Sequence, residues 1–148
     1  MSGQDLLDVI EDSWSFTPLQ ARAIIDTNAF GNVLVAGDDG RYWRICPEEL
    51  SCEPIAASEE ELERLRSSPE FKADWEMERL AELGNSLFGR PPAGRCFCLK
   101  IPAVLGGAYD ASNLATITIL ELLAASGEIA SQIKDLPDGA KVRLKIVD

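Results

Sequence analysis

The chain has 148 residues, of which 46% are hydrophobic and 26% charged, a composition typical of a folded protein of about one domain. Its net charge of −11 at pH 7 argues against nucleic acids and anionic membrane surfaces as partners, because both are bound mainly through Lys and Arg. The sequence contains no histidine, the commonest general base and metal ligand, and we predict no catalytic residue, no metal site and no cofactor.

Two further expectations concern domains and location. The chain divides into an N-terminal module, residues 1–57, and a second part, residues 58–148, unless both pack as one compact unit. No apolar run approaches the roughly 18 residues that span a bilayer, and the N-terminus lacks the positive region of a signal peptide. We therefore expect a cytoplasmic protein that binds no membrane.

The first elements in chain order are two predicted helices. Residues 4–12 carry apolar side chains at helical spacing. The run Thr17-Pro18-Leu19-Gln20 contains an N-cap residue, a proline suited to the first helical position and a glutamine suited to a capping box. It predicts that a second helix begins there.

A hairpin follows, with strands at residues 33–36 and 41–45 around Asp39-Gly40, a pair that favours a two-residue type I′ turn. In that register Asp38 lies opposite Arg41, and Leu34 lies opposite Ile45. The first strand is apolar on both faces, and we expect other elements to cover it from both sides. Residues 51–56 predict a third, edge strand because they include a proline.

Two helices are predicted next, one beginning at Ser58 and a longer one over residues 69–88. On the long helix, one stripe is apolar and predicted to face the core: Ala73, Met77, Leu80, Gly84, Leu87 and Phe88. A second row combines two aromatic residues with two acids: Phe71, Trp75, Glu78 and Glu82. This row either packs beneath the N-terminal helices or binds a protein partner, because interfaces favour aromatic anchors surrounded by charge.

The remaining elements are strands at residues 95–101, 115–118 and 141–147, and a helix that begins after Thr118. The order ααβββααββαβ does not alternate regularly, and it predicts an α+β fold with helices packed on a mostly antiparallel sheet. The spacing of Cys46, Cys52, Cys96 and Cys98 fits zinc poorly, and we expect reduced, half-buried thiols.

Residues 94–107, Gly-Arg-Cys-Phe-Cys-Leu-Lys-Ile-Pro-Ala-Val-Leu-Gly-Gly, are followed by Asn113-Leu114. This stretch resembles the C-terminal domain family of type VI secretion DNase-immunity proteins. The hairpin with Gly40-Arg41-Tyr42-Trp43-Arg44 resembles the small module that often precedes that domain, so that the resemblance covers about residues 30–147. Its most specific positions form a structural motif: Pro102, Gly106, Gly107 and Asn113.

The resemblance implies a non-enzymatic protein that binds a cognate secreted nuclease and blocks it. The charge agrees independently, since a nuclease presents a basic groove to its substrate and an acidic protein is complementary to it. The candidate partner-binding residues are Phe71, Trp75, Glu78, Glu82, Trp43, Asp38 and Asp39.

Two other functions stay open at this point. One is a cytoplasmic adaptor or housekeeping interaction domain with no toxin partner. The other is a small hydrolase that uses paired carboxylates, Asp110 and Glu121, near Gly106-Gly107. The identity of the partner, the face that binds it and the oligomeric state are not predicted.

Overall fold

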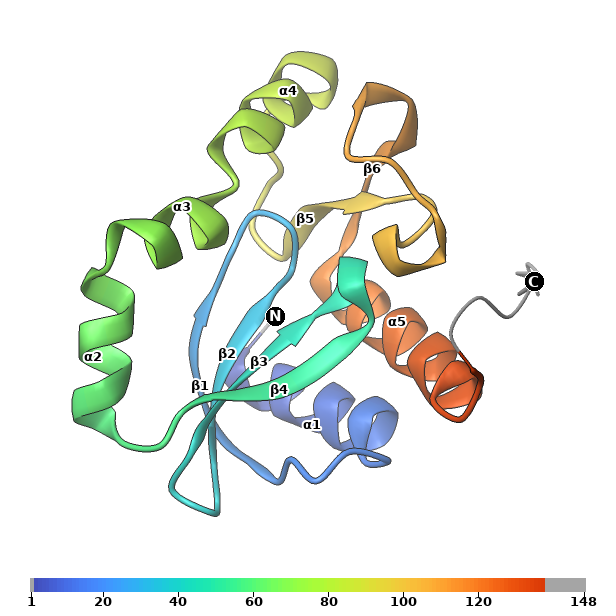
Figure 1. Ribbon diagram of the computed structural model, residues 1–148. Coiled ribbons are helices and arrows are strands. Elements are labelled where there is room, and N and C mark those ends of the chain that lie inside the picture. The colour runs from blue at the N-terminus through green and yellow to red at the C-terminus, as the bar shows by residue number, and fades with distance from the viewer. Residues whose placement is uncertain (1, 138–148) are drawn as a thin grey trace.

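The computed structural model describes residues 2–137 and has an α+β architecture, as predicted (Figure 1). A four-stranded antiparallel sheet has the order β1-β2-β3-β4, and a separate two-stranded antiparallel sheet pairs β5 with β6. The elements are α1 (Gly3–Trp14), β1 (Ala21–Thr27), β2 (Val33–Gly37), β3 (Tyr42–Cys46), η1 (Pro47–Glu49), β4 (Ser51–Ala56), α2 (Glu59–Ser67), α3 (Pro69–Glu76), α4 (Glu78–Phe88), β5 (Arg95–Leu99), η2 (Ala103–Leu105), η3 (Ala111–Asn113), β6 (Leu114–Thr118) and α5 (Ile119–Ile133), where η marks a short 3₁₀ helix. The strand predicted at residues 141–147 lies outside the described residues.

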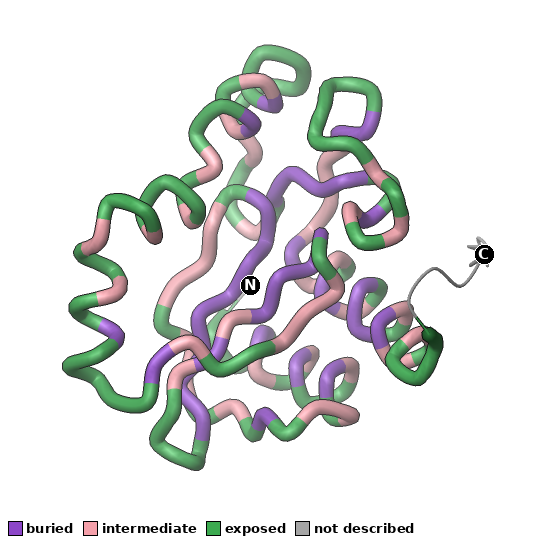
Figure 2. The backbone as a smooth tube through the Cα atoms, viewed as in Figure 1, coloured by how far each residue is buried: buried purple, intermediate pink, exposed green. Residues whose placement is uncertain are grey.

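Strand β2 is at the centre of the fold, and all five of its residues are buried (Figure 2). On one face, Val33 and Val35 belong to a core that α1 and α5 close as two adjacent helices. On the other face, Leu34 lies between Asp26 of β1 and Arg44 of β3. Asp26 forms an ion pair with Arg66 of α2, and Arg44 forms one with Asp74 of α3. The prediction that this apolar strand needs cover from both sides is confirmed.

A second core joins α4 to the small sheet. It contains Phe30, Leu80, Phe97, Leu99 and Leu114, with the two phenylalanine ring centroids 5.7 Å apart. Helix α4 approaches the sheet closely at Gly84, where an added Cβ would lie 2.8 Å from the Phe97 ring. Within residues 2–137, no helix is long and apolar enough to cross a membrane.

The helix predicted from Thr17 is wrong, because that segment leads into strand β1. The Thr17 hydroxyl donates a hydrogen bond to the Trp14 carbonyl (2.7 Å) and so closes the end of α1 instead of beginning a helix. The following residues extend and pair with β2. Pairing with a buried strand outweighs a local capping pattern, since helix propensity is a weak preference that tertiary contacts override.

The hairpin between β2 and β3 exists, but its predicted register is wrong by one residue. Val33 lies opposite Ile45 and Leu34 opposite Arg44, and four residues, 38–41, separate the two strands; of these only Gly40 has a positive φ (+80°). This register places Val33 and Val35 of β2 on the same face as Trp43 and Ile45 of β3, the face that α1 and α5 cover, and a shift by one would turn the side chains of one strand to the opposite face.

The charge pair at the hairpin tip also differs from the predicted one. Arg41 pairs with Asp39 at 2.7 Å, and the predicted partner was Asp38. Hydrogen bonds from Arg41 lower the pKa of the Asp39 carboxyl below its usual value.

The long helix predicted over residues 69–88 is divided at Met77, whose φ of +45° is left-handed. Helix α3 lies against β3, whereas α4 packs on the small sheet, and one straight helix cannot do both. The side-chain amide of Asn28 donates to the Trp75 carbonyl (2.9 Å) near the break. The predicted apolar stripe is therefore wrong at both ends, because Ala73 is exposed on α3 and Leu87 and Phe88 on α4 are each 49% exposed.

Candidate partner-binding surface

The predicted motif builds a tightly closed loop between β5 and β6. Asn113 is its centre: the side-chain amide nitrogen donates to the carbonyls of Ile101 (2.9 Å) and Ala108 (3.0 Å), and the side-chain oxygen accepts from the Ile101 N–H (2.9 Å). At Gly107, an added Cβ would lie 1.8 Å from the Ile101 carbonyl oxygen, so only glycine fits. Asn113 and Gly107 therefore fix the course of this loop.

The other two motif residues shape the same loop. The carbonyl of Pro102, a buried residue, accepts hydrogen bonds from the N–H groups of Leu105 (3.0 Å) and Gly107 (3.1 Å). Gly106 has a φ of +95°, a left-handed conformation that glycine adopts without strain. The motif is thus a structural device that positions the residues after it.

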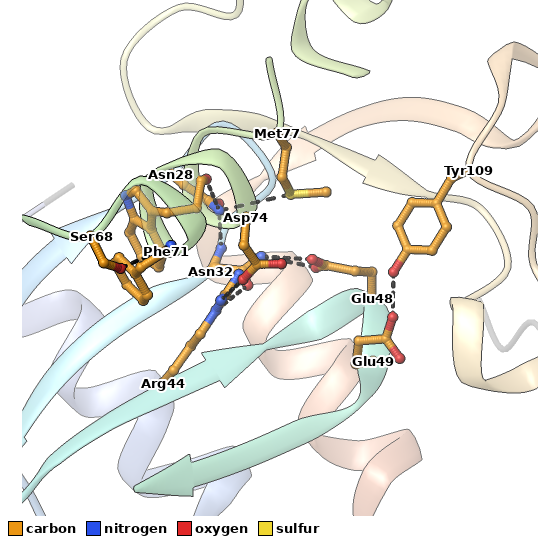
Figure 3. Close-up of polar contacts among 11 residues, drawn as sticks. Asn28, Asn32, Arg44, Glu48, Glu49, Ser68, Phe71, Asp74, Met77 and Tyr109 are labelled. Carbon is orange, nitrogen blue, oxygen red and sulfur yellow. Dashed lines mark hydrogen bonds and ion pairs between the residues drawn. The ribbon is translucent and has the colours of Figure 1, made fainter. Parts of the chain in front are cut away.

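One of those residues is Tyr109, whose hydroxyl donates a hydrogen bond to the carboxylate of Glu49 on η1 (Figure 3). This contact joins residues 60 positions apart. Burial of the phenol, together with its hydrogen bond to Glu49 and the negative charge there, raises the pKa of Tyr109 above its usual value.

A cleft of about 390 Å³ opens between Tyr109, strands β3 and β4, and the junction of α3 with α4 (Figure 3). We call it the acidic cleft. Its lining contains four carboxylates and one cationic side chain. The lining residues are Arg44, Cys46, Glu48, Glu49, Ser51, Glu53, Ile55, Asp74, Met77 and Tyr109.

Arg44 is held on the wall of this cleft by several groups. Its Nε donates to the side-chain oxygen of Asn32 (3.0 Å), its Nη1 pairs with Asp74, and its guanidinium lies 5.2 Å from the centroid of the Trp75 ring. The amide nitrogen of Asn32 in turn donates to both oxygens of Glu48, at 3.0 and 2.9 Å. Asn32 thus separates the cation from the buried carboxylate.

The predicted aromatic pair borders this site. Phe71 and Trp75 stack with centroids 6.0 Å apart and an interplanar angle of 12°, and both are half-buried. Trp75 lies against Arg44 on the outer face of the large sheet, whereas α1 lies against the opposite face. The alternative in which this pair packs beneath the N-terminal helices is therefore wrong.

The structure does not bring the other predicted partner residues together. Glu78 and Glu82 are exposed on α4, and Asp38 and Asp39 are exposed at the hairpin tip, at the end of β2 away from Asn32. Trp43 is only 2% exposed and belongs to the main core, so its ring has no free surface for a partner.

Sequence reasoning missed most of the cleft. The sequence pattern singles out neither Glu48 nor Glu49, and Glu53 lies within the edge strand predicted at residues 51–56. The residues that line the cleft come from the segments 44–55, 74–77 and 109, and only the folding of the chain brings these together. The one available signal was the loop motif, which positions Tyr109.

The four cysteines are free thiols, as expected, but Cys46, Cys96 and Cys98 are buried, whereas the prediction was that they are half-buried. Burial raises the pKa of Cys52 to about 11 and of Cys96 to about 12, and burial with the nearby Glu48 charge raises that of Cys46. These thiols therefore stay protonated near neutral pH and are poor nucleophiles. Among residues 2–137, no group of three or more His, Cys, Asp or Glu side chains is placed to hold a metal ion.

The two carboxylates considered for hydrolysis occupy helix starts. Asp110 accepts from the Ser112 N–H (3.1 Å) at the start of η3, and Glu121 lies in the first turn of α5, where its N–H donates to the Thr118 hydroxyl (3.1 Å). Neither lines the acidic cleft. The cleft, with four carboxylates and one arginine, has a negative charge that favours a cationic side chain of a ligand.

Replacing Glu49 by glutamine is expected to lower the pKa of Tyr109 toward that of free tyrosine, because the negative charge beside the phenol is removed. In the native protein the folded state holds this proton more tightly than the unfolded state, so Tyr109 favours folding below pH about 10 and this contribution is lost as the pH rises. Absorbance titration at 295 nm checks the shift, with Tyr109→Phe to assign the signal. An unchanged titration would contradict the contact.

Solved structures show where this fold has been seen. The crystal structure of Atu4351 from Agrobacterium tumefaciens is similar, with a TM-score of 0.59 and 16% sequence identity. The match covers 86% of this chain and 65% of that one, so the present chain spans about two thirds of its length. This likeness concerns the fold alone. Among curated proteins, none matches the chain.

The fold and the acidic cleft define a small acidic α+β protein with a surface suited to cationic ligands. A family model described as T6SS immunity protein Tdi1, C-terminal, matches residues 56–130, about half of the chain. The chain therefore belongs to this family of type VI secretion immunity-protein domains, and the resemblance predicted from residues 94–107 is confirmed. The match does not extend to the N-terminal hairpin module.

Proposed function

We propose that this protein is a non-enzymatic immunity protein of the cytoplasm, which binds a cognate toxin of nuclease type and blocks it. The family match over residues 56–130 carries this proposal. The net charge of −11 supports it, because a nuclease that binds DNA presents a basic groove and an acidic protein is complementary to that groove.

The binding face in this proposal is the one that carries α3, α4 and the acidic cleft. Phe71 and Trp75 support it from within, since Trp75 braces Arg44. Glu78 and Glu82 lie on its exposed rim. Rim charges of this kind chiefly raise the association rate and make it sensitive to salt, whereas buried contacts determine dissociation. Asp38 and Asp39, at the far hairpin tip, are not part of this face.

The proposal predicts that a toxin nuclease is encoded beside the gene of this protein, and it is tested with that nuclease in purified form. Plasmid cleavage by that nuclease is expected to stop at a one-to-one ratio of the two proteins, and association is expected to slow as salt is raised. Glu82→Lys, on the rim of the face, is expected to slow association, and Asp38→Lys, with the same charge change away from the face, serves as its control. Full nuclease activity in the presence of excess protein would contradict the immunity function and favour an adaptor with no toxin partner.

A further inference from the structure

A second cavity adjoins the acidic cleft. This apolar pocket, of about 180 Å³, lies between η1, β5 and α5. Its lining is mainly hydrophobic: Phe30, Pro47, Glu48, Cys98, Leu99, Lys100, Pro102, Ile117, Leu122, Ala125, Ser126 and Ile129. Glu48 lines both cavities, so the acidic cleft and the apolar pocket share one wall. Lys100 and Ala125 are exposed and mark where the pocket reaches the surface.

Glu48 itself is unusual on that shared wall. It is 7% exposed, and its carboxylate accepts two hydrogen bonds from the uncharged side-chain amide of Asn32. None of the ion pairs among residues 2–137 includes it. Burying a carboxylate without a cation costs free energy, and a cation entering the neighbouring cleft would offset that cost.

The loop beside the cleft also exposes apolar surface. Ile101 is 47% exposed, Val104 53% and Tyr109 36%. The hydrogen bonds of Asn113 and the close contact at Gly107 hold this loop in one conformation. A rigid apolar protrusion next to a charged cleft is a combination typical of protein interfaces, because little conformational entropy is lost when a partner binds it.

We propose that the acidic cleft and the apolar pocket together bind one segment of a protein partner, which places a lysine or arginine in the cleft and a neighbouring aliphatic or aromatic side chain in the pocket. The identification of this partner with the toxin rests on the proposed function. Charge decides the class of occupant, since four carboxylates against one arginine repel nucleic acids and acidic peptides.

Two substitutions test the two cavities separately. Glu53→Lys reverses an exposed charge of the cleft, and Ala125→Arg fills the mouth of the apolar pocket from the exposed side of α5. Asp38→Lys at the hairpin tip and Ala93→Arg in the loop before β5 are the matched controls, and both positions are exposed. Because all four positions are exposed, we expect circular dichroism to show four folded proteins.

In the first measurement, isothermal titration calorimetry gives the affinity for the neighbouring nuclease. Each cavity variant is expected to weaken binding by at least about tenfold, and each control by less than about threefold. If the native protein binds and the cavity variants bind equally well, the inference is overturned and the proposed function stands. If the native protein does not bind this nuclease, the proposed function is overturned, and the second measurement decides the inference.

The second measurement uses a peptide probe and needs no toxin. The full-length protein, labelled with ¹⁵N, is titrated with acetyl-Leu-Arg-Leu-Arg-Leu-amide and with the matched peptide in which glutamate replaces arginine. Amide shifts at Glu49, Glu53 and Ala125 with the arginine peptide alone support the inference. Shifts elsewhere, or equal shifts with both peptides, overturn it.

The chain's own last residues are a rival occupant, since Lys141, Arg143 and Lys145 alternate there with apolar residues. A full-length variant with these three residues changed to glutamate distinguishes a partner segment from the chain's own last residues as the occupant of the cleft. If its amide signals around the acidic cleft match those of the native protein, the cleft is free for a partner. If they shift, the site belongs to the chain's own C-terminal segment and the inference is overturned.

Discussion

Replacing Trp14 by alanine is expected to lower the free energy of unfolding by about 4 kcal/mol, since removal of a buried tryptophan side chain leaves a large cavity. Trp14 is 1% exposed, and its indole N–H donates to the carbonyl of Leu123 at 3.0 Å. It therefore connects α1, near the start of the chain, to α5, most of which lies within residues 56–130, the part of the chain that the family model matches. Nearby, an added Cβ at Gly127 of α5 would lie 2.5 Å from the Ser13 carbonyl, so the two helices are in close contact.

Urea denaturation followed by both fluorescence and far-ultraviolet circular dichroism measures the loss. The same experiment tests whether residues 1–57 and 58–148 pack as one unit, because one cooperative core is expected to unfold in a single transition seen by both probes. Hydrogen exchange of the variant is then expected to be faster in α1 and in α5 together. Trp14→Phe is the matched variant, which keeps an aromatic ring and removes the hydrogen bond. Two separate transitions, with α5 unaffected, would contradict the single-unit arrangement.

Replacing Gly107 by alanine is expected to lower the free energy of unfolding by about 3 kcal/mol, at the upper end of the range for overpacking. The added methyl group would lie 1.8 Å from the Ile101 carbonyl oxygen and 2.7 Å from the Asn113 amide nitrogen. The backbone must move to accommodate it, which breaks the hydrogen bonds that close the loop. Tyr109 then loses its position beside Glu49, and one wall of the acidic cleft is lost.

Gly106→Ala is the control for this variant. An added Cβ at Gly106 meets nothing within 4 Å, so its cost is limited to the left-handed backbone conformation, about 1–2 kcal/mol. Thermal unfolding ranks the two variants, and the absorbance titration of Tyr109 reports whether its contact with Glu49 survives. An equal loss of stability in both variants would show that crowding at Gly107 is not the cause.

The parts of the fold that were predicted correctly depend on short stretches of sequence. Ser58 and Thr118 each accept a hydrogen bond from the backbone N–H three residues later, which is the predicted cap of α2 and of α5. The edge strand around Pro54 and the pairing of two β-prone runs around Gly40 are local in the same sense.

The errors occurred where a distant segment outweighed the local pattern. Thr17 has the features of a helix start, but the next residues pair with β2. Met77 continues a helical pattern, yet α3 and α4 turn there to reach different sheets. The hairpin shifted by one residue because the helices on its inner face select the register that buries Trp43.

The same distinction between local and distant contacts holds for the candidate site. The sequence by itself determined the acidic charge, the lack of histidine, the family motif and the helix caps, because composition and short-range hydrogen bonds need no knowledge of distant contacts. Only the tertiary structure decided that Glu48, Asp74 and Tyr109 line one cleft while Trp43 is buried. The physical reason is that side chains from separate segments converge only after the sheets and helices bury their apolar faces against one another.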